Sequence, residues 1–366
     1  MSTASAPETF DSWVGHDVTD VVKGELKFEP VPVKPWDEDD IDVKVTHCGL
    51  CGSDFSMLAG HFFPLLPQQV CGHEIVGEVT RIGSQVKDVK VGDRVGIGAQ
   101  CDGCLECEWC VKGEEQFCPQ MTFTLGAPYP RGNAKGTFSH GGFAKYWRGP
   151  ARFAIPIPAS LDSAEAAPLL CAGATVYSPL KYYGAGPGKN IGVVGIGGLG
   201  HVAVMLAKAM GASVTVLSRG EAKRDEAKQL GADDYIPTTK DAAADVKGRE
   251  RSLDFIICTI NPESLPASDY MTMLKPRGTF VLLGIVPKPL ELSTMGMVVG
   301  VSGIAGSQIG SPAELKELME FAAKHKIRPW VQKCSMDNIN QAMADYQAGK
   351  PKYRIVLVNT DNGGTL

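Results

Sequence analysis

The strongest constraint on how this chain folds is a glycine pattern at residues 195–200, where the sequence is Gly-Ile-Gly-Gly-Leu-Gly. The pattern follows an apolar run at 191–194 and precedes an apolar stretch at 201–210. A buried strand, a G-x-G-x-x-G turn and a helix form a βαβ unit that binds a dinucleotide, because the glycines let the backbone approach the pyrophosphate at the helix N-terminus. We therefore expect a doubly wound parallel sheet with cofactor contacts at Gly195, Gly197, Gly198, Leu199 and Gly200.

The chain divides into two parts with different sequence patterns, and the glycine motif lies in the second part. From Lys23 to Phe153, short alternating apolar stretches separated by Gly, Pro and Asp predict a β-rich module with long loops. From Ala172 onward, short buried runs at 191–194, 213–217, 255–258 and 279–283 predict the strands of an α/β domain. Two amphipathic helices and a strand at 353–358 should rejoin the first module. The expected domains are thus 1–171 with 312–366, and 172–311.

Composition restricts the kind of partner. The 366 residues are 44% hydrophobic and 21% charged with a net charge of −5, which favours neither nucleic acid nor an anionic membrane surface. The first fifteen residues lack the pattern of a secretory signal, and no apolar run is long enough to cross a bilayer. We therefore expect a cytoplasmic protein with a small-molecule substrate, in which the eleven cysteines serve metal binding and not disulfides.

Four cysteines with the spacing C-x2-C-x2-C-x7-C predict a closed zinc site. They are Cys104, Cys107, Cys110 and Cys118, in a polar, loop-like stretch. Four thiolates complete a tetrahedral shell and leave no position for a substrate, so the expected role is structural. Cys101 permits a second register, in which the ligands are Cys101, Cys104, Cys107 and Cys110 and Cys118 is free.

A second group of metal-binding residues is spread along the sequence and predicts a reactive site. Cys51, His73 and Cys171 supply two thiolates and an imidazole, which leaves the fourth zinc position open for water or substrate. Asp54 is expected to orient the imidazole. Glu74 is either a supporting residue or an occasional metal ligand, and the sequence leaves both open.

The end of the strand at 213–217 predicts which dinucleotide binds. An acidic residue there would accept a hydrogen bond from a free ribose 2′-hydroxyl, but the chain has Ser218-Arg219, followed by Lys223 and Arg224. A missing acid and added cations favour a 2′-phosphate, and hence NADP(H). The cations at 223 and 224 could instead belong to a solvated helix face.

Together these motifs resemble the zinc-containing medium-chain dehydrogenase/reductase superfamily, in its cinnamyl alcohol dehydrogenase-like branch of NADP-dependent enzymes. The resemblance covers nearly the whole chain and rests on Cys-Gly-Ser-Asp at 51–54, Gly-His-Glu at 72–74, Val-Gly-Asp-Arg-Val at 91–95, Gly-Gly-Phe-Ala at 141–144, Pro-Leu-Leu-Cys-Ala-Gly at 168–173, Thr-Val-Tyr-Ser-Pro at 175–179, the glycine motif and Tyr353-Arg354.

The resemblance implies a GroES-like catalytic domain, a Rossmann domain and usually a homodimer. It also implies two zinc ions per chain, with Cys51, His73 and Cys171 at the catalytic ion and the later cysteine register at the structural ion. Further cofactor contacts would be Thr175, Ser218, Arg219, Lys223 and Arg354. The substrate-pocket candidates are Leu58, Phe62, Phe63 and Phe123.

The implied reaction is reversible hydride transfer between NADP(H) and a primary alcohol/aldehyde pair, with aldehyde reduction as the expected cellular direction. Ser53 would act as the proton donor. Many relatives have a histidine five residues after the first zinc cysteine to carry that proton outward, but this chain has Ser56, so water or His61 would have to serve. One alternative function is the reduction of an activated C=C or C=N bond, and another is that of a non-catalytic NADPH-binding protein. A polyol dehydrogenase is disfavoured, because such relatives lack the third cysteine-type ligand that Cys171 would supply here.

Overall fold

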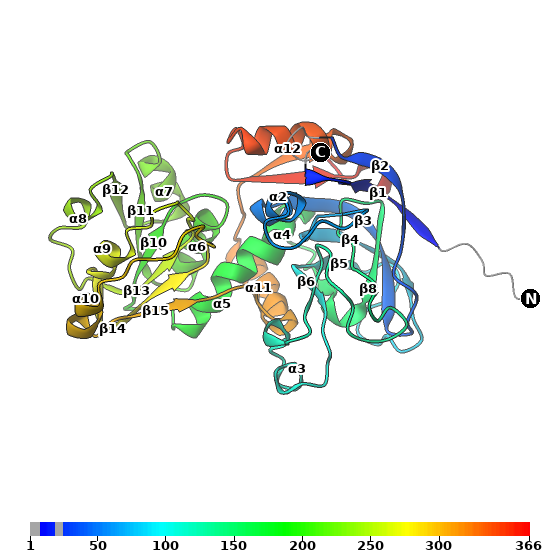
Figure 1. The fold of residues 1–366 in the computed structure, drawn as a ribbon, viewed down its shortest axis with the longest axis horizontal. Helices are drawn as coiled ribbons and strands as arrows, with labels where there is room; N and C mark the ends of the chain where they lie inside the picture. The colour runs from blue at the N-terminus through cyan, green and yellow to red at the C-terminus, as the bar shows by residue number, and fades with distance from the viewer. Residues whose placement is uncertain (1–7, 19–24) are drawn as a thin grey trace, which may run out of the picture. The chain divides into compact units, whose positions relative to one another are not determined.

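The computed structural model describes residues 8–18 and 25–366, so the predicted start of the β-rich module at Lys23 lies outside the described residues. The chain divides into two compact units, one formed by residues 1–171 with 310–366 and the other by residues 172–309. A β-rich unit and a parallel α/β unit confirm the predicted fold class (Figure 1).

The first unit is built on a seven-stranded sheet. Its strands, in spatial order, are β16 (Val331–Ser335), β17 (Arg354–Val358), β3 (Asp40–Leu50), β4 (Ile75–Ile82), β5 (Arg94–Ile97) and β9 (Ile155–Pro156), and β8 (Tyr146–Pro150) also pairs with β3. β17 lies antiparallel to β3, with Ile355 opposite Leu50. The C-terminal tail therefore supplies a strand next to the central strand of the first unit, as expected.

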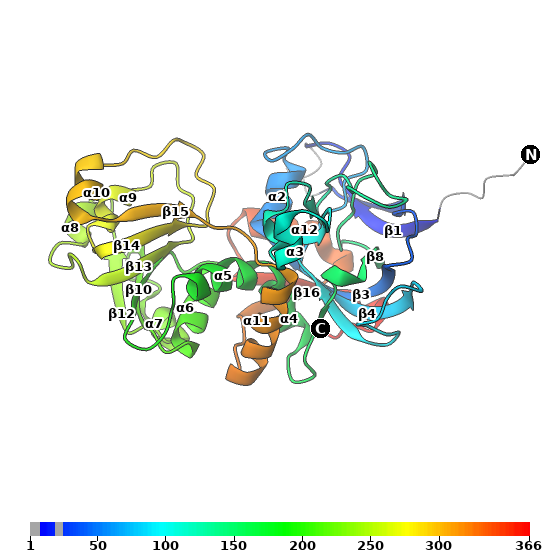
Figure 2. The same cartoon turned by 90° about the horizontal axis from the view of Figure 1, so that it is seen from below.

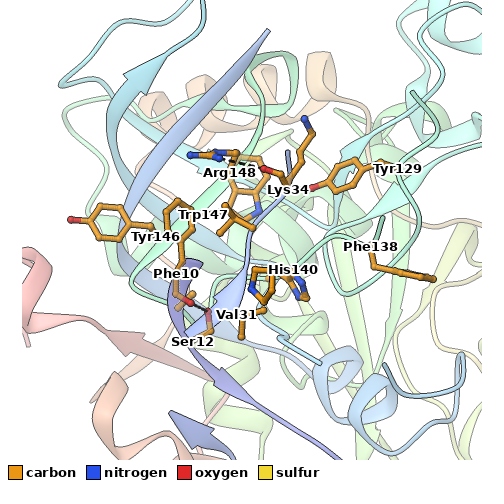
Figure 3. Close-up of a pocket in the computed structure, with 14 residues that line it drawn as sticks. Phe10, Ser12, Val31, Lys34, Tyr129, Phe138, His140, Tyr146, Trp147 and Arg148 are labelled. Carbon is orange, nitrogen blue, oxygen red and sulfur yellow. Dashed lines mark hydrogen bonds between the residues drawn. The ribbon is translucent and has the colours of Figure 1, made fainter. Parts of the chain in front are cut away.

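A hairpin of β1 (Thr9–Val14) and β2 (Lys27–Pro32) lies in the same unit. The Arg148 guanidinium on β8 binds both carboxylate oxygens of Asp42, at 2.7 and 3.0 Å, and lies over the ring of Phe10 from the hairpin. Figure 3 labels Arg148 and Phe10. This buried charge pair joins β8 to β3, and the contact of Arg148 with Phe10 holds the hairpin against the sheet.

The cysteine-rich lobe lies between two short paired strands of this unit, β6 (Gln100–Asp102) and β7 (Thr122–Phe123), and contains α3 (Glu108–Lys112). The buried Glu115 carboxylate binds the guanidinium of Arg152, and the Gln116 amide donates to Glu314 of α11 (Pro312–His325). α11 also packs against β9 (Figure 2). These contacts tie the lobe to the body of the unit.

The second unit contains a six-stranded parallel sheet. The spatial order is β12 (Asp234–Thr238), β11 (Ser213–Arg219), β10 (Asn190–Val194), β13 (Leu253–Cys258), β14 (Leu274–Leu282) and β15 (Gly303–Gly306). The flanking helices include α5 (Ala174–Tyr182), α6 (Gly200–Ala209), α7 (Arg224–Leu230), α8 (Ala242–Asp245), α9 (Ala267–Met271) and α10 (Thr294–Gly300). The strands expected near 191, 213, 255 and 279 are all present, because continuous apolar runs are typical of parallel strands covered on both faces.

Candidate functional site

Four side chains of the kinds that can bind a metal, from distant parts of the sequence, meet in the first unit. One possible ligand atom from each of Cys51, His73, Glu74 and Cys171 lies within 4.8 Å of the others, and all four residues are buried. Cys51 lies between β3 and α2 (Gly52–Leu58), and His73 and Glu74 immediately precede β4. Cys171 is in a π-helical turn, Leu169–Gly173, that follows α4 (Ser163–Pro168). π-helical turns recur at functional sites, and here the turn brings the last ligand into the cluster.

Asp54 organises this cluster through three hydrogen bonds. Its carboxylate accepts from the backbone N–H of Cys51 at 2.8 Å, from that of Gly72 at 2.9 Å and from His73 Nδ1 at 2.9 Å. Because Nδ1 is held by the carboxylate, Nε2 is the ring nitrogen that a metal would bind, displacing the proton it carries. This geometry agrees with the expectation that Asp54 orients the imidazole of His73.

The charges around the cluster favour a thiolate at Cys51. A hydrogen bond from the Cys171 thiol, together with the positive charges of Arg354 and His73, lowers the pKa of Cys51 well below its ordinary value despite burial. Burial alone would lower the pKa of His73, but Asp54 and Cys51 raise it well above the ordinary value. A thiolate is the form of cysteine that binds a metal, so these groups together suit a shared cation.

Glu74 and Arg354 form a buried ion pair beside the cluster. An Nη2–H of Arg354 donates to Glu74 Oε1, and in the described part of the chain Oε2 has no hydrogen-bond partner. Oε2 packs against Gly49, where a Cβ would lie 1.9 Å from it. Burial raises the pKa of Glu74 to about 7, with Arg354 opposing that shift. One carboxylate oxygen therefore remains for a metal or a proton, while Arg354, predicted as a cofactor residue, binds Glu74.

The four-cysteine lobe forms the later of the two possible registers. Single sulfur atoms of Cys104, Cys107, Cys110 and Cys118 all lie within 4.8 Å of one another, and the sulfurs of Cys104 and Cys118 are 3.5 Å apart. In a tetrahedral shell with Zn–S bonds of about 2.3 Å, sulfurs lie about 3.8 Å apart. Cys101 is instead fully buried in the core, where burial raises its pKa to about 12. The alternative register with Cys101 is therefore wrong.

The glycine motif of the second unit borders a pocket of about 420 Å³, a size suited to a cofactor. Gly195 has a φ of +83°, and a Cβ there would lie 2.2 Å from Ile260. A Cβ on Gly200 would meet the carbonyl oxygen of Gly195 at 1.9 Å, whereas Gly197 has nothing within 4 Å of that position. Gly197 thus leaves space for a ligand, and Gly195 and Gly200 allow the tight turn.

The cations near the end of β11 are not equivalent. Lys223 Nζ donates to the carbonyl of Ile196 at 3.0 Å, and Arg224 is paired with Glu221 at 2.6 Å. Arg219 is exposed, lines the pocket with Ser218, and has no recorded side-chain partner within the described residues. Arg219 is therefore the cation most available to an anionic ligand.

The remaining predicted residues differ in their surroundings. Thr175 is buried in α5, and Leu199 directly precedes α6. Leu58 belongs to the core cluster of the first unit, Phe62 and Phe63 are 38% and 53% exposed, and Phe123 is half-buried in β7. The assignment of these four residues to a substrate pocket stays a prediction. The hollow beside the hairpin (Figure 3) has a volume of only about 20 Å³, enough for roughly one water molecule and too small for an organic substrate.

Two parts of these sites were missed by the sequence analysis. The Thr259 hydroxyl, just after β13, lies 2.9 and 3.1 Å from the carbonyl oxygens of Val194 and Gly195, which share its one proton, and so supports the glycine turn. A ligand crevice at the carboxyl ends of the parallel strands would have pointed to this position. The pairing of Arg354 with Glu74 joins residues 280 positions apart, and no local sequence pattern predicts it.

Comparison with known proteins agrees with both units. Residues 37–159 match the alcohol dehydrogenase GroES-like domain, and residues 198–324 match the zinc-binding dehydrogenase domain. The 8-hydroxygeraniol dehydrogenase of Catharanthus roseus is 42% identical over 326 residues, which cover 87% of this chain and 88% of that protein. The chain belongs to the zinc-type alcohol dehydrogenases. This confirms the predicted superfamily and its cinnamyl alcohol dehydrogenase-like branch.

Other members of the family extend the comparison. Cinnamyl alcohol dehydrogenase 2 of Rauvolfia serpentina is 41% identical, over 90% of this chain and 89% of its own length, and the mannitol dehydrogenase of Apium graveolens is 40% identical, over 94% and 92%. The structure of a cinnamyl alcohol dehydrogenase from Sorghum bicolor superposes with a TM-score of 0.89 at 35% identity, covering 98% of this chain and 99% of that one. None of the helices in the described residues of this dehydrogenase could span a bilayer.

Replacing Asp54 with asparagine should weaken metal binding at the buried cluster. The substitution keeps the shape but removes the charge that holds His73 Nδ1, and losses of about 10- to 100-fold in affinity follow removal of such partners. Competition with a chromophoric chelator would measure the zinc affinity. Asp88→Asn, at an exposed position, is the control; equal affinities in the two variants would contradict the assignment.

Proposed function

We propose that this dehydrogenase reduces aldehydes to primary alcohols with NADPH, reversibly, using a zinc ion held by Cys51, His73 and Cys171. The observation that carries the proposal is the buried donor cluster, in which Asp54 presents His73 Nε2 next to the two sulfurs, with Nε2 3.2 Å from Cys171 Sγ. Two thiolates and an imidazole suit zinc and leave a fourth position for substrate. The named activities of the relatives, on 8-hydroxygeraniol, cinnamyl alcohol and mannitol, support an alcohol/aldehyde pair.

The two donor clusters suit two zinc ions with different tasks. The four cysteines of the lobe would hold a structural ion, because a shell of four thiolates is closed. At the buried cluster, a zinc ion held by Cys51, His73 and Cys171 would supply Lewis-acid polarisation of the substrate carbonyl. Arg354 holds one oxygen of Glu74, which favours Glu74 as a supporting residue with a single oxygen available to the ion.

Ser53 is the residue of this chain best placed to supply a proton. Its Oγ lies 3.9 Å from Cys51 Sγ, at the first turn of α2, and its side chain is half-buried. A hydroxyl so close to a ligand sulfur would donate its proton to the substrate oxygen as the carbonyl is reduced. Asp54, fixed in the same turn by the backbone of Cys51, keeps this turn in place.

NADP(H) is the cofactor that the strand-end residues support best. Ser218 and the exposed Arg219 stand where an acid would otherwise bind a free ribose, and Arg219 is available for a 2′-phosphate. Lys223, which already binds Ile196, would hold the glycine loop and add positive charge nearby. A related cinnamyl alcohol dehydrogenase from Helicobacter pylori, 29% identical with a TM-score of 0.85 over 96% of this chain and 99% of that one, was solved with NADP(H).

The sheet edge of the second unit supports a homodimer. β15 is the last strand of the sheet order, and the neighbouring helix α10 and the residue after it expose Met295, Val298, Val299 and Val301. Val298 is 75% exposed. An unpaired strand edge beside exposed apolar side chains matches a self-complementary interface, in which two copies cover the same surface of each other.

The first test compares the two zinc assignments during aldehyde reduction. Cys51→Ser should abolish NADPH oxidation with cinnamaldehyde, benzaldehyde and medium-chain aldehydes and lower the zinc content from two ions to one. Cys104→Ser should mainly lower the unfolding temperature, because a closed site contributes to folding. Elemental analysis, calorimetry and product analysis would measure these effects. Reduction of the C=C bond of an enal, or equal thermal losses in both variants, would contradict the proposal.

The second test concerns the cofactor. Ser218→Asp combined with Arg219→Ile should raise the KM for NADPH by at least about 10-fold and improve NADH relative to it, because a charge-assisted phosphate contact is lost and a repulsion is added. Arg224→Ile is the matched control, since Glu221 already holds that guanidinium. A wild type that prefers NADH would refute the assignment without any variant.

The third test concerns assembly. Light scattering should give a mass of about twice the 39.0 kDa of one chain. Val298→Asp should shift the protein to monomers, whereas Val111→Asp, equally 75% exposed but in α3, should leave the mass unchanged. A monomeric wild type, or dimers that persist in Val298→Asp, would argue against this interface.

A further inference from the structure

A tyrosine from the C-terminal tail lies over the turn that carries Cys51 and Ser53. Tyr346, on α12 (Ile339–Gln347), stacks on Phe55 of α2, with ring centroids 4.6 Å apart and planes 13° from parallel. Its hydroxyl oxygen lies 3.0 Å from the position that a Cβ on Gly52 would occupy. The hydroxyl thus approaches the backbone closely, and a Cβ at position 52 would make a tight contact with it.

The surroundings keep this phenol protonated. Burial, reinforced by the negative charge of Cys51, raises the pKa of Tyr346 to about 12, and Arg354 only partly opposes the shift. The side chain is nevertheless half-buried and not enclosed, so part of it faces solvent. Within the described residues no hydrogen bond of its hydroxyl is recorded, which leaves the group able to donate one proton while it accepts another.

The other candidates for carrying a proton to Ser53 are less well placed. His61 is exposed beyond the end of α2, where its backbone N–H donates to the carbonyl of Ser56 at 2.8 Å. Ser56 is half-buried, and its short side chain cannot reach bulk solvent by itself. The Tyr346 hydroxyl, in contrast, already lies against residue 52, the immediate neighbour of Ser53.

We propose that Tyr346 relays the proton between solvent and Ser53, in place of the histidine that this chain lacks at position 56; the inference rests on the proposed aldehyde reduction. Ser53 gives its hydroxyl proton to the oxygen of the substrate as hydride reaches carbon. The Ser53 oxygen takes a proton from the Tyr346 hydroxyl, directly or through one water molecule, and Tyr346 takes one from solvent. One proton from solvent is consumed for each hydride transferred, and both hydroxyls are restored.

Tyr346→Phe tests the relay, because it keeps the stack on Phe55 and removes only the hydroxyl. We expect kcat for aldehyde reduction to fall roughly 10²-fold, the lower end for losing general acid help, with KM, zinc content and unfolding temperature unchanged. In a single turnover, proton uptake followed with an indicator dye should lag behind NADPH oxidation, and the solvent isotope effect on kcat should rise.

Two further variants distinguish a proton-relay role of Tyr346 from a purely structural role. His61→Ala should behave like the wild type, and Ser56→His in the Tyr346→Phe background should restore part of the rate by supplying an imidazole beside Ser53. A wild type without NADPH-dependent aldehyde turnover would overturn the proposed function and the relay with it. A Tyr346→Phe enzyme with wild-type rate and isotope effect, or one whose loss tracks lost zinc, would overturn the relay alone.

Discussion

The carboxylate of Asp54 is the interaction on which the rest of the site depends. A single buried side chain accepts hydrogen bonds from the backbone on both sides of the cluster, at Cys51 and at Gly72, and from the imidazole of His73. It therefore fixes the distance between two chain segments and the tautomer of a ligand at the same time. Burying an unpaired carboxylate would be costly, so the three donors and the charge they satisfy form one cooperative unit.

Two elements from far along the sequence pack around Asp54 and the residues that it binds. The C-terminal strand β17 pairs with β3 and thereby brings Arg354 to Glu74. α12, which precedes β17 in the same tail, brings Tyr346 to α2. The C-terminal residues thus pack against the buried donor cluster and its helix α2, although they follow the whole second unit in the sequence.

How much of this was predictable depends on how local each signal is. The glycine motif, the parallel strands and the four-cysteine lobe were found from spacing and periodicity alone, because each lies within a short window and has few structural solutions. Cys171 could be joined to Cys51 and His73 only by resemblance and chemistry. The pairing of Glu74 with Arg354 and the stacking of Tyr346 on Phe55 depend on strand register and helix packing, which a single sequence does not encode locally.

The π-helical turn that carries Cys171 lies where the chain passes from the first unit to the second. The first segment of the first unit ends at residue 171, and the second unit begins at residue 172. Every donor of both cysteine-containing clusters therefore lies outside the segment 172–309. Recombination between relatives with crossovers at these two junctions would exchange the nucleotide-binding segment as a cassette and carry all the metal ligands over intact. On the proposed function, cofactor preference and metal chemistry can in this way be inherited separately, which suits this architecture to diversification by segment exchange.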